Sequence, residues 1–173
     1  KAINLHPKFN LVGGIDIKEK SRRIFEERYG KNTFKSILNF SNEELIDLVI
    51  IATPTETHLE IIENTLKVLK PKMILCEKPL AYNYDDAQNI LNLCNFYNTK
   101  LFVNYIRRSN PEVLEIKKNI DKKLFIPPFR GICWYSKGLY NNGSHFINLL
   151  EFSDLSILKS ENFLIIIFFF KYF

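Results

Sequence analysis

The chain has 173 residues, of which 46% are apolar and 25% are charged. These values are ordinary for a globular protein, and the length suits one domain or one domain with part of another. The net charge of +5 comes from lysines scattered along the sequence rather than from one basic run. We therefore expect a globular protein without a nucleic-acid partner.

The three cysteines, Cys76, Cys94 and Cys133, lie far apart and fit neither a metal-ligand spacing nor a disulfide framework. This usage predicts a reducing, cytoplasmic setting and no metal site. An apolar block at 163–170 is too short for a membrane span, which needs about 20 residues, so we expect no membrane partner. The block is interpreted either as a core strand or as residues that follow a break in the reading frame.

Up to residue 104 the sequence alternates short apolar runs with patterns of helical spacing. Residues 41–44 carry the capping-box pattern of a helix start. In chain order the patterns predict a strand at 9–15, a helix at 18–29, an irregular piece at 34–38, a strand at 47–52, a helix at 56–69, a strand at 73–76, a helix at 85–97 and a strand at 100–103. The alternation predicts an α/β fold with a doubly wound parallel sheet.

The predicted strand at 73–76 runs directly into Glu77, Lys78 and Pro79. Pro79 has no N–H to continue the sheet, so both charges stand at the carboxyl end of the strand, where ligands bind in open α/β sheets. Lys78 is interpreted as a proton shuttle or a hydrogen-bond donor to a substrate hydroxyl. The alternative is a surface ion pair of Glu77 with Lys78.

Other polar residues are predicted at the same sheet edge. Asp16 follows the first predicted strand, where it either accepts hydrogen bonds from a ribose or caps the next helix. His58 lies in the first turn of the helix after Thr53 and Pro54, as a ligand contact or as a surface residue. The strand at 100–103 delivers a further polar group to this edge: Asn104, Tyr105, Arg107, Arg108, Asn110 and Pro111.

The pattern changes after residue 106, and we expect a first domain at 1–106 and the beginning of a second, α+β domain at 107–173. It is predicted to hold a helix from Glu112, a strand at 129–136 and a helix at 141–150. In that last helix, spacings of four and three place Asn141, His145 and Asn148 on one face. Such a row suits a polyhydroxylated ligand, or it is a solvated face while the apolar residues pack inward, namely Phe146, Leu149 and Leu150.

Together these segments resemble one family, the glucose-fructose oxidoreductase, inositol dehydrogenase and rhizopine catabolism family of nicotinamide-dependent oxidoreductases. The resemblance covers residues 1–152. It rests on five motifs in order: Val12-Gly13-Gly14-Ile15-Asp16, Ala52-Thr53-Pro54 with His58, Glu77-Lys78-Pro79, Asn104-Tyr105 through Arg108 with Asn110-Pro111, and Gly143-Ser144-His145.

The resemblance implies a Rossmann domain that binds NAD or NADP, followed by a domain whose open sheet supports homo-oligomers. It implies a sugar, sugar nucleotide or cyclitol as substrate, with Lys78 at the reacting oxygen and His145 exchanging the hydroxyl proton. Asp16 favours NAD, and Arg22 and Arg23 keep NADP open. By resemblance the cofactor residues are Asp16, Thr53, Pro54, Thr55, His58, Glu77, Lys78 and Asn104, and the substrate residues are Lys78, Arg107, Asn141 and His145.

The sequence departs from the family pattern in three places. The glycine-rich turn of the first strand and most of the second domain are absent, and Lys1 and the single Met73 also lead us to expect a fragment. Asn141 stands where many members have an aspartate, and an amide cannot take a proton. The alternative to an oxidoreductase is therefore a non-catalytic or decayed Rossmann-fold ligand-binding fragment.

Overall fold

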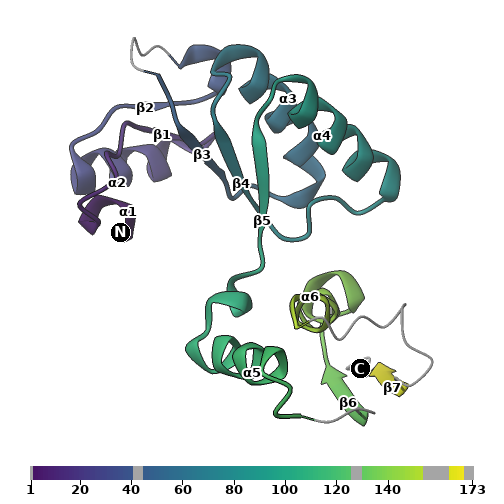
Figure 1. The fold of residues 1–173 in the computed structure, drawn as a ribbon. Coiled ribbons are helices and arrows are strands. Elements are labelled where there is room, and N and C mark those ends of the chain that lie inside the picture. Colours follow the sequence, from purple (N-terminus) through teal and green to yellow (C-terminus); the bar gives the residue numbers. More distant parts are fainter. Residues whose placement is uncertain (1, 41–44, 126–129, 154–163, 170–173) are drawn as a thin grey trace.

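The computed structural model describes residues 2–40, 45–125, 130–153 and 164–169. Figure 1 shows a layer of strands and helices formed by residues up to 105, with the later elements gathered at one end of it. None of the helices within these ranges is both long and apolar enough to cross a membrane. The expected capping box at 41–44 lies outside the described residues.

The first part of the chain forms a small parallel pair of strands with a helix between them. Gly14 and Ile15 pair with Thr33 and Phe34, so the predicted strand at 9–15 is wrong in length, because only its last two residues find a partner. Gly30 ends the helix in the left-handed conformation at φ 60°, which glycine adopts without strain. The elements are α1 (Ala2–Leu5), β1 (Gly14–Ile15), α2 (Glu19–Tyr29) and β2 (Thr33–Phe34).

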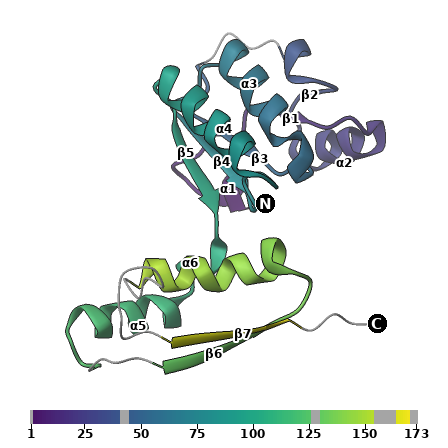
Figure 2. The ribbon, with the colours of Figure 1, turned by 90° about the vertical axis from the view of Figure 1, so that its right-hand side faces the viewer.

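The centre of the fold is a second parallel sheet with strand order β3-β4-β5, in which β4 lies in the middle. Figures 1 and 2 show α3 and α4 side by side on one face of this sheet. The strands and their two covering helices confirm the predicted α/β alternation. Their bounds, with two short 3-10 helices, are η1 (Ile37–Asn39), β3 (Leu48–Ile51), η2 (Thr55–Thr57), α3 (His58–Val68), β4 (Met73–Glu77), α4 (Tyr84–Phe96) and β5 (Lys100–Asn104).

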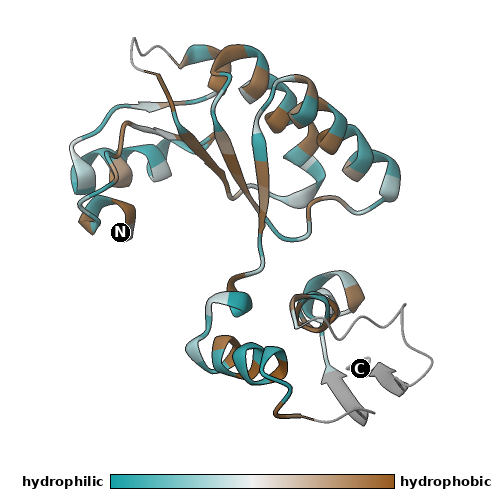
Figure 3. Ribbon diagram, in the orientation of Figure 1, coloured by the Kyte–Doolittle hydropathy of each residue, from teal (hydrophilic) through white to brown (hydrophobic). Residues whose placement is uncertain are grey.

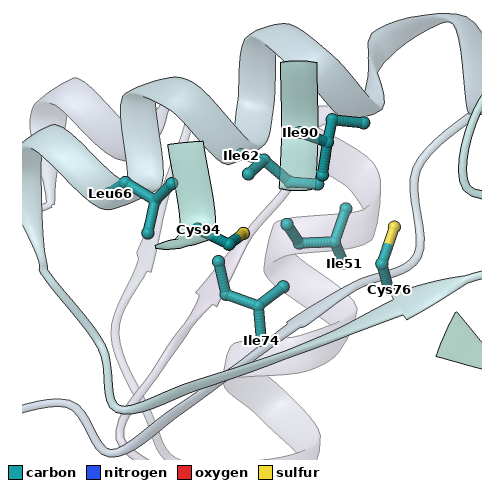
Figure 4. Close-up of a cluster of buried hydrophobic side chains, with 7 residues drawn as sticks. All are labelled: Ile51, Ile62, Leu66, Ile74, Cys76, Ile90 and Cys94. Carbon is teal, nitrogen blue, oxygen red and sulfur yellow. The ribbon is translucent and has the colours of Figure 1, made fainter. Parts of the chain in front are cut away.

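The hydrophobic core lies between this sheet and its two helices. Figure 3 shows the apolar runs of the strands and the apolar stripes of the helices. Burial of these side chains is what stabilises the layer, since apolar area removed from water contributes about 25 cal/mol per Å². The buried cluster in Figure 4 comprises Ile51, Ile62, Leu66, Ile74, Cys76, Ile90 and Cys94.

Among the described residues β1-β2 and β3-β4-β5 form two separate parallel sheets. A complete doubly wound sheet of this kind has six strands in the order 3-2-1-4-5-6. In this chain β2 and β1 correspond to strands 3 and 2 of that order, and β3, β4 and β5 correspond to strands 4, 5 and 6. No described residue forms the strand between them. Both sheets keep the parallel direction that the alternation predicts.

After β5 the chain forms a second group of elements. The apolar block contributes β7, which pairs parallel with β6. Asn110 caps α5 by accepting a hydrogen bond from the backbone N–H of Glu112 at 2.8 Å. The elements are η3 (Ile106–Ser109), α5 (Pro111–Asp121), β6 (Arg130–Tyr135), η4 (Leu139–Gly143), α6 (Ser144–Phe152) and β7 (Leu164–Phe169).

Two predicted helices begin later as α-helices than the sequence suggests. The helix expected at 56–69 opens with the 3-10 turn η2, because the N–H of Thr57 bonds the carbonyl of Pro54 at 2.9 Å. The helix expected at 141–150 opens with the π-helical turn η4, and α6 starts at Ser144. Both irregular turns lie directly beside residues of the predicted site.

The fold makes a prediction about β4. Replacing Ile74, which is fully buried, with alanine should lower the free energy of unfolding by about 2–5 kcal/mol, because it removes buried methylenes and leaves a cavity. Ile50 on the neighbouring strand is 43% exposed, so Ile50→Ala should cost less than about 1.5 kcal/mol. Urea unfolding measures both, and equal losses would contradict the core described here.

Candidate functional site

The end of β4 holds the residue pair on which the site is built. Glu77 stands opposite Asn104 of β5, and its carboxylate accepts a hydrogen bond from the Asn104 side-chain amide at 2.6 Å. The ammonium of Lys78 donates instead to Asn141, to the backbone oxygen at 3.2 Å and to the side-chain oxygen. The alternative of a surface ion pair between Glu77 and Lys78 is therefore wrong: each binds an asparagine.

The contact of Lys78 with Asn141 joins residues 63 positions apart in the sequence. Asn141 belongs to η4, the turn that leads into α6. A side-chain carbon added to Gly143 would lie 2.9 Å from the ring of Tyr135, so this turn packs too closely for any residue larger than glycine. The close packing fixes the path by which the chain enters α6 and brings His145 into the site.

His145 is the second residue of α6 and is only 7% exposed. The ring of Tyr105 meets it edge to face at a centroid distance of 5.7 Å. Nδ1 of His145 is buried and has no hydrogen-bond partner among the described residues. A buried polar atom without a partner is costly, so this nitrogen is a candidate for contact with a ligand.

Three effects lower the pKa of His145 below its ordinary value of 6.5. Burial is the largest, followed by the positive charges of Arg107 and Lys78, while the charge of Glu77 acts in the opposite direction. The imidazole is thus held neutral near neutral pH. A neutral ring keeps a lone pair on one nitrogen, which is what acceptance of a substrate proton requires.

Two of the three residues of the predicted polar row, His145 and Asn148, face inward, so the alternative of a solvated face is wrong for them, whereas Asn141 is exposed in η4. His145 and Asn148 are 7% and 8% exposed, while the apolar residues that we expected to pack inward, Phe146, Leu149 and Leu150, are only half-buried. Asn148 faces inward because Arg108, in the η3 turn, donates a hydrogen bond from Nε to its side-chain oxygen. The guanidinium of Arg107 lies 5.3 Å from the centre of the Phe146 ring.

His58 does not lie where the sequence reasoning places it. Its side chain is 1% exposed, with Nδ1 3.0 Å from the carbonyl oxygen of Leu80 and Nε2 3.0 Å from that of Thr53. A ring with both nitrogens engaged inside the protein can neither contact a cofactor nor count as a surface residue. It instead ties the loop after β3 to the loop after β4, the loop that carries Lys78.

The remaining predicted cofactor residues lie at the carboxyl ends of β1 and β3. Asp16 is exposed, and one carboxylate oxygen accepts from the backbone N–H of Lys18 at 2.7 Å. Its second oxygen has no partner among the described residues. Thr53 and Pro54 are exposed, and Thr55 is half-buried in η2. Exposed acceptors and hydroxyls along this edge fit a dinucleotide.

Sequence reasoning missed three contributors to the site. The contact between Asn141 and Lys78 joins two motifs that no local pattern connects. Tyr105 lies in a recognised motif, but its contact with His145 crosses between separate elements. Cys76, 3.3 Å from Nδ1 of His58, was assigned no packing role. The one available signal was the four-residue spacing of Asn141 and His145, which places them on the same side of the turn.

The fold and this edge define an α/β protein of the dinucleotide-binding class. The model of the oxidoreductase family with an NAD-binding Rossmann fold, Gfo/Idh/MocA, matches residues 1–105, which is more than half of the chain. The chain therefore belongs to the Gfo/Idh/MocA family of oxidoreductases.

Individual relatives agree with this assignment. Inositol 2-dehydrogenase of Rubrobacter xylanophilus is 31% identical over 123 residues, which are 69% of this chain and 35% of the relative. An oxidoreductase from Agrobacterium radiobacter, solved with NAD⁺, L-tartaric acid and magnesium, has a TM-score of 0.77 at 18% identity. The WlbA dehydrogenase from Bordetella pertussis, solved with NADH and UDP-GlcNAcA, has a TM-score of 0.73 at 19% identity.

Both solved structures show the same fold, and each comparison covers 87% of this chain and 49% of the other. The chain thus spans about half the length of these structures and about a third of the inositol dehydrogenase.

The electrostatics of the site predict how the pKa of His145 responds to substitution. Arg107→Gln should raise the pKa of His145, because it removes a positive charge that disfavours the imidazolium. Glu77→Gln should lower it further for the opposite reason. A pH titration of the imidazole NMR signals measures both shifts, and a pKa that is the same in both variants would contradict the described arrangement.

The position of His58 predicts a structural role. His58→Ala should lower the free energy of unfolding by about 2–3 kcal/mol, because it removes a buried ring that lies between the carbonyl oxygens of Thr53 and Leu80 and leaves the one to which its N–H donates without a donor. His6→Ala, at an exposed residue, is the matched control and should change stability by less than about 0.5 kcal/mol. If thermal or urea unfolding shows equal effects, His58 does not tie the two loops together.

Proposed function

We propose that the protein carrying this chain is an NAD(P)-dependent oxidoreductase. It transfers hydride between the nicotinamide and a secondary alcohol of a sugar, sugar nucleotide or cyclitol. One observation supports this proposal most. Lys78 binds Asn141, four residues before His145, and the positive charge of Lys78 lowers the pKa of the buried imidazole. A hydrogen-bond donor and a proton acceptor then face one reacting alcohol.

We assign the cofactor to the carboxyl edge of the strands. Asp16 accepts hydrogen bonds from the adenosine ribose through its free carboxylate oxygen, which favours NAD. Arg22, whose side chain donates to the backbone oxygen of Asp16 at 2.8 Å, is close enough to accommodate NADP. Towards the nicotinamide, the contacts come from Thr53, Pro54, Thr55, Glu77, Lys78 and Asn104.

The chain's own residues handle the proton, and the nicotinamide ring, when bound, supplies the hydride chemistry. Lys78 donates a hydrogen bond to the substrate oxygen and positions it. His145 takes the hydroxyl proton as the alcohol becomes a ketone, and returns it in the reverse reaction. Asn141 holds Lys78 and orients the hydroxyl, since an amide cannot accept the proton itself. We assign Arg107, whose guanidinium lies over the ring of Phe146 next to His145, to substrate binding.

The comparisons support a polyol-like substrate. The relative from Rubrobacter xylanophilus is named an inositol 2-dehydrogenase, and the WlbA structure holds a sugar nucleotide. Both compounds carry secondary alcohols, the group on which Lys78 and His145 would act.

We also propose the setting in which the site works. We place the nucleotide-binding domain at 1–106 and the start of the substrate domain at 107, with Lys78 of the first bonded to Asn141 of the second. Cys76 and Cys94 are buried free thiols, and burial raises the pKa of Cys76 to about 12, which suits a reducing cytoplasm. We assign oligomerisation of identical subunits to the open sheet of the second domain.

The central prediction concerns Lys78. Lys78→Ala should reduce kcat on the order of 10²–10⁴-fold, because the substrate oxygen loses its donor and His145 loses a charge that keeps it neutral. Lys67→Ala, which removes an exposed ammonium from α3, should leave kcat unchanged. The change in NADH absorbance during turnover measures both.

Titration with NAD and NADP separates the oxidoreductase from the alternative, a non-catalytic ligand-binding fragment. Binding of either nucleotide together with full turnover by Lys78→Ala would remove Lys78 from the mechanism. A protein that binds neither nucleotide would contradict the proposed function as a whole.

A further inference from the structure

The residues around His145 carry an excess of positive charge that no described group neutralises. Lys78 and Arg107 are the cations whose charges act on the imidazole, and Glu77 is the only carboxylate that does so. The carboxylate of Glu77 is already engaged, because it accepts a hydrogen bond from Asn104. Two cations and one anion leave a net charge of about +1 beside a buried, neutral ring.

Neither cation has an acidic partner among the described residues. Lys78 binds the oxygens of Asn141, an uncharged amide. The described ion pairs, which lie on α2, α3, α5 and between Lys72 and Asp47, include neither Lys78 nor Arg107. A half-buried charge without a counter-ion is unfavourable in a protein, so its retention at a ligand site suggests that the ligand supplies the opposite charge.

Arg107 is held in a way that suits recognition of an anion. It follows β5 in the η3 turn, is half-buried, and lies 5.3 Å from the centre of the Phe146 ring. This contact is a cation–π interaction, which involves the face of the ring and leaves the N–H groups at the edge of the guanidinium. Its N–H groups donate to no described residue. They are available to a carboxylate, which a guanidinium binds with two parallel hydrogen bonds.

A second observation indicates that a ligand belongs at this point. Nδ1 of His145 is buried and has no partner among the described residues, although the ring is more than nine-tenths buried. Native proteins leave few such atoms unpaired, and a bound polar molecule is a common reason. The guanidinium of Arg107 lies over the ring of Phe146, the residue that follows His145 in α6, so the unpaired nitrogen and the unpaired guanidinium lie at one place in the fold.

We propose that the substrate of this site is a sugar acid, whose carboxylate binds Arg107 while its secondary alcohol lies between Lys78 and His145. This assignment rests on the proposed function and narrows its substrate class. A carboxylate carries a single negative charge and so balances the net charge of the site, whereas a phosphate dianion would exceed it.

Asn141 is a second determinant of this specificity. An aspartate at position 141 would form an ion pair with Lys78 and cancel the charge excess. Asparagine holds the ammonium in the same place by a hydrogen bond but leaves its charge for the substrate. The charge at residue 141 thus selects between anionic and neutral substrates, and Asn141→Asp changes that charge while preserving the shape of the side chain.

Calorimetric titration of the protein with D-glucuronate, D-glucose and D-glucose 6-phosphate, in the presence of NADH, tests the assignment. The wild type should bind glucuronate at least about tenfold more tightly than glucose, and more tightly than the phosphate. Arg107→Gln and Asn141→Asp should each remove most of the preference for glucuronate. Lys67→Gln removes one positive charge from α3 and is the matched control, which should keep the preference.

Equal binding of glucuronate and glucose by the wild type, or an unchanged preference in both site variants, overturns the sugar-acid assignment. Tighter binding of the phosphate overturns the choice of a carboxylate. None of these results affects the proposed function, which is judged by the separate titration with NAD and NADP. Far-UV circular dichroism of each variant establishes whether it is folded. If one of the two site variants does not fold, the other still tests the assignment, because the two substitutions are at different residues.

Discussion

The hydrogen bonds from Lys78 to Asn141 are the contact on which the account depends. They join the end of the central strand β4 to the turn that leads into α6, across 63 residues of sequence. Pro79 and the parallel register with β5 fix the lysine on one side, and the close packing at Gly143 fixes the asparagine on the other. The site therefore inherits its geometry from two well-packed elements, which is the condition for precise placement of reacting groups.

Electrostatics then determine what this geometry can do. The same burial that makes His145 hard to protonate also strengthens its interactions with nearby charges, because the local dielectric is low. In the proposed mechanism Lys78 therefore has two roles, as a donor towards the substrate oxygen and as a charge that keeps the imidazole neutral. Family membership supports the proposal of a nucleotide at the strand edge, while the proposal for the substrate side rests on the unbalanced charge of this chain.

The sequence predicted the strands between residues 47 and 104 well, and it failed where tertiary contacts decide. Glu77 and Lys78 could be placed because Pro79 ends a buried apolar run in any context. His58 could not, since a first-turn histidine looks the same whether it faces solvent or links Thr53 to Leu80. The inward polar face of α6 likewise depends on Arg108 binding Asn148, a contact that no helical periodicity reveals.

A crystal structure of the protein with NADH bound tests the central claim most directly. The account predicts the nicotinamide ring at the end of β4, with Lys78 and His145 both within about 4 Å of one site beside its reactive face. A nicotinamide bound elsewhere, or with Lys78 and His145 on opposite sides of the molecule, would contradict the account.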